Sequence, residues 1–197
     1  MRNPDAFLAA AALAAATLAA PLSAQTVVEL RASTTKYRFL DVAHIFANHV
    51  VLDALYLGVP GMNELYLGAG YQLRPAAGVS VAPILYAVLG KENRERGACL
   101  GALLSVDRGG WKVLGFVGHF FRTGGGVSDY TFVDALDLTR VSGRWELGAS
   151  AGAYETRGDM TWLVGPTVKR NDRRGAWVAS ARFGNDAELR LIRILSF

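Results

Sequence analysis

The feature that most constrains this chain is an alternation of apolar and polar residues that recurs up to the last residue. Residues 144–155 show it clearly, with Trp145 and further apolar residues on one side and Glu146 with small or polar residues on the other. Residues 63–74 and 176–184 repeat the pattern. Because successive side chains of a strand point to opposite faces, this period of two predicts β-strands.

Turn-forming residues separate these runs at short, regular intervals. Glycine, asparagine and aspartate supply the positive φ that tight hairpins need. The turn segments are 60–62, 76–78, 91–97, 108–110, 124–129, 142–143, 157–159, 170–175 and 184–186. We predict ten strands between His49 and Phe197. Residues 25–46 form either a first hairpin or an N-terminal extension, and the spacing predicts an antiparallel meander, sandwich or barrel.

Composition limits the class of protein. A chain of 197 residues with 51% hydrophobic residues is long enough for one folded domain and is too apolar for a disordered one. One cysteine and three histidines argue against a disulfide framework or a metal cluster. The net charge of +4 comes without a dense Lys/Arg run, so a nucleic-acid partner is not indicated. No cofactor motif is present, and the sequence identifies no small-molecule ligand.

The N-terminus predicts export. Residues 1–24 combine Arg2, an uncharged alanine-rich run from Phe7 to Ala20, and small residues up to Ala24. This is the order of a secretory signal peptide. We therefore expect cleavage near Ala24, which leaves residues 25–197 as the mature domain.

The four tryptophans help to decide which face of the strands meets water. Trp111, Trp145, Trp162 and Trp177 each lie within the first few residues of a predicted strand. Membrane barrels place aromatic rings at the two interfaces, where an amphipathic ring contacts both apolar and wet zones. The tryptophans are therefore candidates for an aromatic girdle.

The polar faces suit the inside of a barrel. Glu64, Glu146, Lys169, Arg182 and Arg190 lie on faces that are rich in glycine and other small residues. Such faces favour a narrow lumen, in which small residues leave room for paired charges. We expect opposite charges to pair there, because isolated charges are costly in a low-dielectric interior.

The final strand is the most specific signal. Leu189, Leu191, Leu195 and Phe197 share one face of an alternating strand that ends in an aromatic residue. This resembles the last strand of bacterial outer-membrane β-barrel proteins, whose terminal aromatic is read by the barrel-assembly machinery. The resemblance implies an all-β fold, a closed antiparallel meander transmembrane β-barrel of 10–12 strands. It also implies a location in the outer membrane, with membrane lipid and the assembly machinery as partners.

Four residues depart from this pattern. Arg193 interrupts the lipid-facing series, at a cost that is about 2–4 kcal/mol at the bilayer midplane and smaller near an interface. Pro83 and Pro166 each remove a hydrogen bond from a ladder. Asp53 conflicts with the apolar face on which Leu55 lies.

Orientation follows from the resemblance, which implies that both termini lie in the periplasm and that the number of strands is even. The turns at 60–62, 91–97, 124–129, 157–159 and 184–186 then face the outside. The turns at 76–78, 108–110, 142–143 and 170–175 face the periplasm.

Catalytic and metal sites have weak support. His119, Ser128 and Asp134 contain the residue types of a nucleophile–base–acid set, but no motif fixes their geometry. Asp41, His44 and His49 would need further ligands to hold a metal.

We therefore expect a non-enzymatic integral barrel with a structural or interaction role and, in addition, a narrow pore. Two alternatives stay open: a barrel enzyme that acts on lipid or peptide, and a secreted soluble ligand-binding barrel.

The terminal aromatic yields a first prediction. Replacing Phe197 by Ala is expected to impair outer-membrane insertion much more than Phe183→Ala, a change of the same residue type in another predicted strand. The reason is that the assembly machinery reads the last strand. Cell fractionation with a heat-modifiability gel measures insertion, and normal levels of the Phe197→Ala protein would contradict the role given to this residue.

Overall fold

The computed structural model describes residues 24–60, 62–90, 96–124 and 128–197. The predicted signal peptide falls, except for Ala24, outside these residues. The described residues form thirteen strands. They are β1 (Gln25–Ser33), β2 (Arg38–Ile45), β3 (Val50–Val59), β4 (Met62–Tyr71), β5 (Leu73–Ala76), β6 (Val79–Gly90), β7 (Arg96–Arg108), β8 (Trp111–Gly124), β9 (Tyr130–Ser142), β10 (Trp145–Thr156), β11 (Asp159–Asp172), β12 (Gly175–Gly184) and β13 (Ala187–Ser196).

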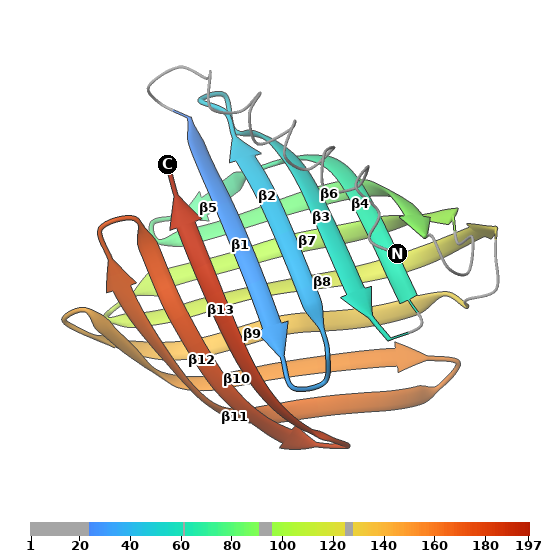
Figure 1. Ribbon diagram of the computed structural model, residues 1–197. Coiled ribbons are helices and arrows are strands. Elements are labelled where there is room, and N and C mark those ends of the chain that lie inside the picture. Colours follow the sequence, from blue (N-terminus) through green and yellow to red (C-terminus); the bar gives the residue numbers. More distant parts are fainter. Residues whose placement is uncertain (1–23, 61, 91–95, 125–127) are drawn as a thin grey trace.

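The strands form one antiparallel sheet that closes on itself (Figure 1). Every strand pairs with its neighbours in sequence, except that β4 and β5 do not pair with each other; β4 pairs with β6 instead, and β1 pairs with β13. The short β5 follows β4 after Gln72 and pairs with the same neighbour, β6. Because β4 and β5 together occupy one strand position in the wall, the barrel is twelve-stranded. This confirms the predicted closed meander of 10–12 strands. Residues 25–46 form the first hairpin, β1–β2, rather than an extension.

None of the described segments forms a helix that is long and apolar enough to cross a membrane.

The outer surface of the barrel is apolar. Large hydrophobic side chains on it are between about a third and two thirds exposed, as at Leu85 (61%) and Leu189 (59%). The alternate residues of the same strands, such as Tyr86 and Glu188, are almost fully buried. This is the reverse of a soluble barrel, whose apolar face lies inside, and it is the arrangement that a lipid environment requires. The faces predicted for residues 63–74, 144–155 and 176–184 agree with it.

One half of the interior is an aromatic core. Tyr66, Tyr86, Phe116 and Phe132 form a row across β4, β6, β8 and β9, with successive ring centroids 5.5–6.0 Å apart. Most neighbouring pairs meet edge to face, which is a favoured geometry for aromatic rings. Val51, Ile84 and Phe120, among others, pack into the same cluster.

Glycine makes room for these rings. A Cβ atom on Gly101 would lie 2.4 Å from Cζ of Phe116, and one on Gly118 would lie 2.6 Å from Cζ of Phe132. The small residues of the inward faces therefore accommodate aromatic rings in this half, besides the paired charges that the sequence suggested.

The two prolines lie where the ladders are interrupted. Pro83 is opposite the break between β4 and β5. The residues of β6 from Ile84 onward pair with β4, and those up to Val81 pair with β5, so Pro83 lies between the two ladders. Pro166 lies in a gap of the β11–β12 register, between Val164 and Thr167. Each missing N–H therefore falls at a position where no ladder bond is made.

A β-bulge interrupts β9. Between residues 133 and 137, β9 contains one residue more than the facing segment of β8 and of β10. Ala135, within this bulge, has a positive φ of 48°. A bulge re-aims the side chains beyond it. Here it places Asp134 and Asp137, three residues apart, on the same inner face, where both line one cavity.

The ring-over-glycine packing gives a second prediction. Gly101→Ala should destabilise the barrel by about 1–3 kcal/mol, because overpacking would push Phe116 out of the aromatic row. Gly124→Ala is the matched control, since nothing lies within 4 Å of its added Cβ. Urea unfolding in detergent micelles measures both, and equal midpoints for the two variants would contradict the packing.

Candidate functional site

Among the described residues, two cavities are found in the lumen, one toward each end of the barrel. The cavity of about 250 Å³ lies toward the hairpin end at Val59, Thr161 and Arg182, and we call it the loop-side cavity. The cavity of about 390 Å³ lies toward Gln25 and Ile194, at the end of the barrel where β1 begins and β13 ends, and we call it the terminal-side cavity. Phe116 and Asp134 line both cavities, so the two meet at this level of the barrel.

A chain of alternating acidic and basic side chains connects the two cavities, and we call it the ion chain. In order of contact it consists of Glu29, Arg31, Asp134, Arg190, Glu188 and Arg182.

The contacts of the ion chain are continuous. Arg31 pairs with both Glu29 and Asp134. Arg190 Nη1 lies 3.2 Å from Asp134 Oδ1, and its Nη2 lies 3.5 Å from Glu188 Oε2. Arg182 closes the series by donating through Nε to Glu188 Oε2 at 3.0 Å. Three cations and three anions alternate, so the chain carries no net charge.

Burial makes this pairing necessary. The side chains of Arg31, Arg182, Glu188 and Arg190 are each at most 7% exposed. Breaking a buried pair costs about 3–5 kcal/mol, because the remaining partner stays desolvated.

Aromatic rings support two of the cations. The Arg31 guanidinium lies 4.0 Å from the centroid of the Phe39 ring, and that of Arg190 lies 5.1 Å from the Tyr37 ring. Burial raises the pKa of the Tyr37 hydroxyl, in the loop between β1 and β2, so Tyr37 stays protonated beside Arg190.

A second charged group lies in the terminal-side cavity around Glu146. Lys112 Nζ lies 3.0 Å from Glu146 Oε1, and Lys169 Nζ lies 3.5 Å from Oε2. Asn171 Nδ2 donates to Oε1 at 2.8 Å, and Thr139 Oγ1 donates to Oε2 at 3.2 Å. The carboxylate is therefore held by side chains from three neighbouring strands.

In the aromatic half, tyrosine hydroxyls donate hydrogen bonds to the buried carboxylates. Tyr66 donates to Glu64 Oε2 at 2.7 Å, and the Tyr130 hydroxyl lies 3.2 Å from the same oxygen. Tyr86 donates to Asp53 Oδ2 at 2.6 Å. Asp53 and Leu55 thus share an inward face, which accounts for the mixed pattern in the sequence of β3.

The structure places all five predicted lumen residues on inner faces, in three separate groups. Arg182 and Arg190 belong to the ion chain, Glu146 and Lys169 to the second charged group, and Glu64 to the aromatic half.

Sequence reasoning missed several of their partners. Glu188 and Lys112 had a usable signal, since each lies on the inner face of an alternating strand. Arg31 and Glu29 lie in the segment whose structure the sequence left open.

The residues weighed for catalysis are not brought together. His119 Nδ1 bonds Thr131 Oγ1 at 2.7 Å on the outer face of β8, whereas Asp134 is held in the lumen by Arg31. The Ser128 hydroxyl accepts from Arg157 Nε at 2.5 Å. Among the described residues, no hydrogen bond joins His119, Ser128 and Asp134.

The residues weighed for metal binding are also apart. Asp41 lies on the inner face of β2, and His44 on the outer face, where its Nδ1 is 2.9 Å from Thr26 Oγ1. The His49 ring packs edge-on against Tyr71. Within the described part of the chain, no group of three or more potential ligands is placed to hold a metal ion.

The tryptophans and the last residue lie on the outer surface. Trp111, Trp145, Trp162 and Trp177 are between 45% and 48% exposed, near strand ends. Phe197 exchanges two backbone hydrogen bonds with Thr26 of β1, at 2.9 and 3.1 Å, and so takes part in closing the barrel.

Comparison with known proteins supports the fold. No protein family and no curated protein matches the sequence. Among solved structures, the chain is similar to the KdgM porin, with a TM-score of 0.64 and 11% identity over 88% of this chain and 99% of that one. It is also similar to a structure of the KdgM porin in complex with disordered oligogalacturonate, with a TM-score of 0.61 and 12% identity over 88% of this chain and 98% of that one. For the NanC porin the TM-score is 0.60, with 10% identity over 87% of this chain and 98% of that one. The fold is therefore that of a small bacterial outer-membrane β-barrel, which confirms the predicted class.

The Glu146 group gives a third prediction. Glu146→Leu should lower the free energy of unfolding by about 1–3 kcal/mol, because Lys112 and Lys169 lose their shared carboxylate. Glu146→Gln, which keeps the shape and one accepting oxygen, should cost less. Thermal unfolding in detergent measures the series, and an unchanged melting temperature for Glu146→Leu would show that this carboxylate is solvated.

Proposed function

We propose that the protein is an integral outer-membrane barrel that forms a narrow channel for small polar solutes. The observation that carries this proposal is the ion chain, which provides a continuous polar path from one luminal cavity to the other. The contacts across Asp134 narrow that path, so the channel passes less than an open, water-filled barrel would. Residues 1–24 would serve as the export signal and be removed.

The outer surface supports the location. Its apolar residues suit lipid, and the similar structures are porins of nearly the same length. A soluble ligand-binding barrel is disfavoured because its apolar face would lie inside. We propose no enzymatic role, since the residues weighed for catalysis lie on different faces of the wall.

The loop-side cavity favours a class of solute. Aromatic rings such as Tyr66 and Tyr154 line one part of it, and Arg182 and Arg190 line another. A sugar ring packs its C–H groups on aromatic faces, and a carboxylate on it can accept from guanidinium groups. We propose small acidic sugars as the solutes, in keeping with the oligogalacturonate complex of the KdgM porin.

Planar-bilayer recordings test the channel. The wild-type protein should give small, discrete currents. Asp134→Ala should raise the preference for anions, because Arg31 and Arg190 would lose their shared counter-charge. Asp159→Ala, which makes the same charge change at the exposed first residue of β11, should leave the reversal potential in a KCl gradient unchanged. Large currents from the wild type would contradict the narrow lumen, and no current at all would contradict the channel.

The same recordings test the solute. Galacturonate should reduce the wild-type current at lower concentrations than galactose, which lacks the carboxylate. Equal effects of the two sugars would remove the acidic-sugar proposal and leave the channel itself standing.

A further inference from the structure

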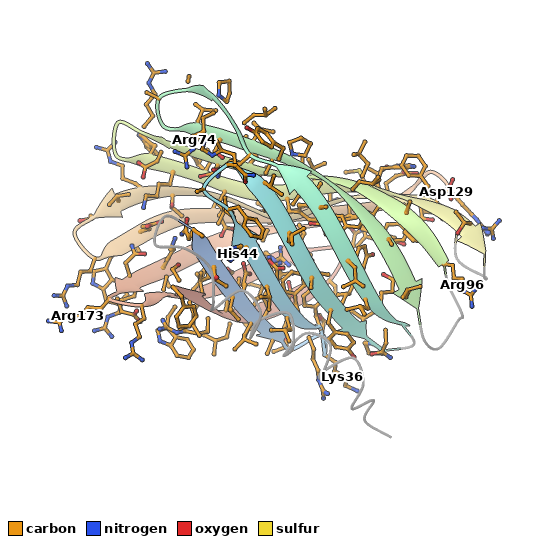
Figure 2. The ribbon with its side chains drawn as sticks, turned by 90° about the horizontal axis from the view of Figure 1, so that it is seen from above. Lys36, His44, Arg74, Arg96, Asp129 and Arg173 are labelled. Carbon is orange, nitrogen blue, oxygen red and sulfur yellow. The ribbon has the colours of Figure 1, made fainter. Side chains whose placement is uncertain are left out.

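Charged side chains are distributed unequally between the two ends of the barrel. Apart from the side chains that line the lumen, the strand ends and turns on the terminal side carry eight arginines and two aspartates, Asp107 and Asp172. The arginines are Arg74, Arg108, Arg140, Arg144, Arg170, Arg173, Arg174 and Arg193. At the opposite end the described residues nearly balance, with five basic side chains (Lys36, Arg38, Arg96, Arg122, Arg157) and four acidic ones (Asp129, Glu155, Asp159, Asp186). Figure 2 shows Arg74 and Arg173 at one end and Arg96 and Asp129 at the other.

Tryptophan and arginine alternate across the outer wall at the basic end. Trp145 of β10 pairs in register with Arg170 of β11, Arg170 with Trp177 of β12, and Trp177 with Arg193 of β13. Neighbouring strands are about 4.8 Å apart, so the row spans roughly 14 Å of the wall. Two strands away, Trp111 of β8 pairs in the same way with Arg140 of β9. We call these six residues the Trp–Arg belt.

The guanidinium groups of the Trp–Arg belt lie against the indole rings. The distances from Cζ to the ring centroid are 5.2 Å for Arg140 and Trp111, 5.7 Å for Arg170 and Trp145, and 5.1 Å for Arg193 and Trp177. These lie within the range of cation–π attraction. The contact holds each long side chain at the level of its half-exposed indole ring.

The cations of the belt are not equally neutralised. Arg193 Nη1 lies 2.6 Å from Asp172 Oδ2. Arg140 and Arg170 are exposed, and neither has a carboxylate within 4.0 Å among the described residues. The belt therefore offers two guanidinium groups whose N–H donors are available at the depth where tryptophan meets lipid headgroups.

We infer that the Trp–Arg belt is a binding surface for anionic phospholipids. The headgroup phosphate accepts from Arg140 or Arg170, and the indole rings pack against the glycerol region and the first methylene groups. The excess of positive charge at this end favours a lipid with net negative charge, such as phosphatidylglycerol, over zwitterionic phosphatidylcholine. This surface is on the outer wall, so it is separate from the luminal channel proposed above.

Quenching of tryptophan fluorescence by brominated lipids tests the inference. The full-length protein with Trp162→Phe, which removes the tryptophan at the opposite end, is reconstituted in vesicles of phosphatidylcholine. Brominated phosphatidylglycerol should quench the remaining fluorescence more strongly than brominated phosphatidylcholine at equal mole fraction. The difference should shrink as salt is raised, since the attraction is electrostatic. Equal quenching by the two lipids at low salt would overturn the inference. This first test needs no substitution of an arginine.

Charge variants locate the surface. Arg140→Gln with Arg170→Gln should weaken the preference for phosphatidylglycerol by about fivefold per arginine. Lys36→Gln with Arg157→Gln makes the same charge change at the opposite end and should leave the preference intact. A heat-modifiability gel checks that both variants are folded. An equal loss in the two variants, or displacement of the lipid by millimolar glycerol 1-phosphate, would overturn the assignment to a lipid surface.

Discussion

The pairing of buried charges in the ion chain is the constraint on which the lumen depends. Arg31, Arg182 and Arg190 are almost completely removed from solvent, and each contacts at least one carboxylate. Such a series is stable only if every member keeps its partners. The partners come from β1, β9, β12 and β13, so closure of the barrel between β1 and β13 is itself a condition for satisfying them.

The two halves of the barrel interior are filled by different kinds of side chain. Large rings above glycines fill the half that includes β4, β6 and β8, and their hydroxyls donate to one carboxylate oxygen each of Glu64 and Asp53. Charge pairs among small residues fill the half formed by β10 to β13 and β1. The loop-side cavity lies along the boundary between the two halves, where aromatic residues face Arg182 and Arg190, and this boundary gives the proposed channel its chemistry at that end.

Much of this architecture was predictable from the sequence, and the remainder was not, for physical reasons. A period of two fixes which face each residue takes as long as the strand runs without interruption, and Glu146 and Arg190, which it predicts to point inward, are both buried. It fails at β9, because the bulge at Ala135 changes the parity and turns both Asp134 and Asp137 inward. Alternation also carries no information on which distant strands meet, so the pairing of Arg31 with Asp134 could not be derived.

Sided accessibility of the two cavities tests the central claim most directly. In a Cys99→Ala background, one variant carries Leu57→Cys in the loop-side cavity and another carries Ile45→Cys in the terminal-side cavity. We predict that a bulky, membrane-impermeant thiol reagent labels Leu57→Cys on intact cells and labels Ile45→Cys only after the outer membrane is permeabilised. Equal labelling of both cysteines on intact cells would show that the ion chain does not narrow the lumen between the two cavities.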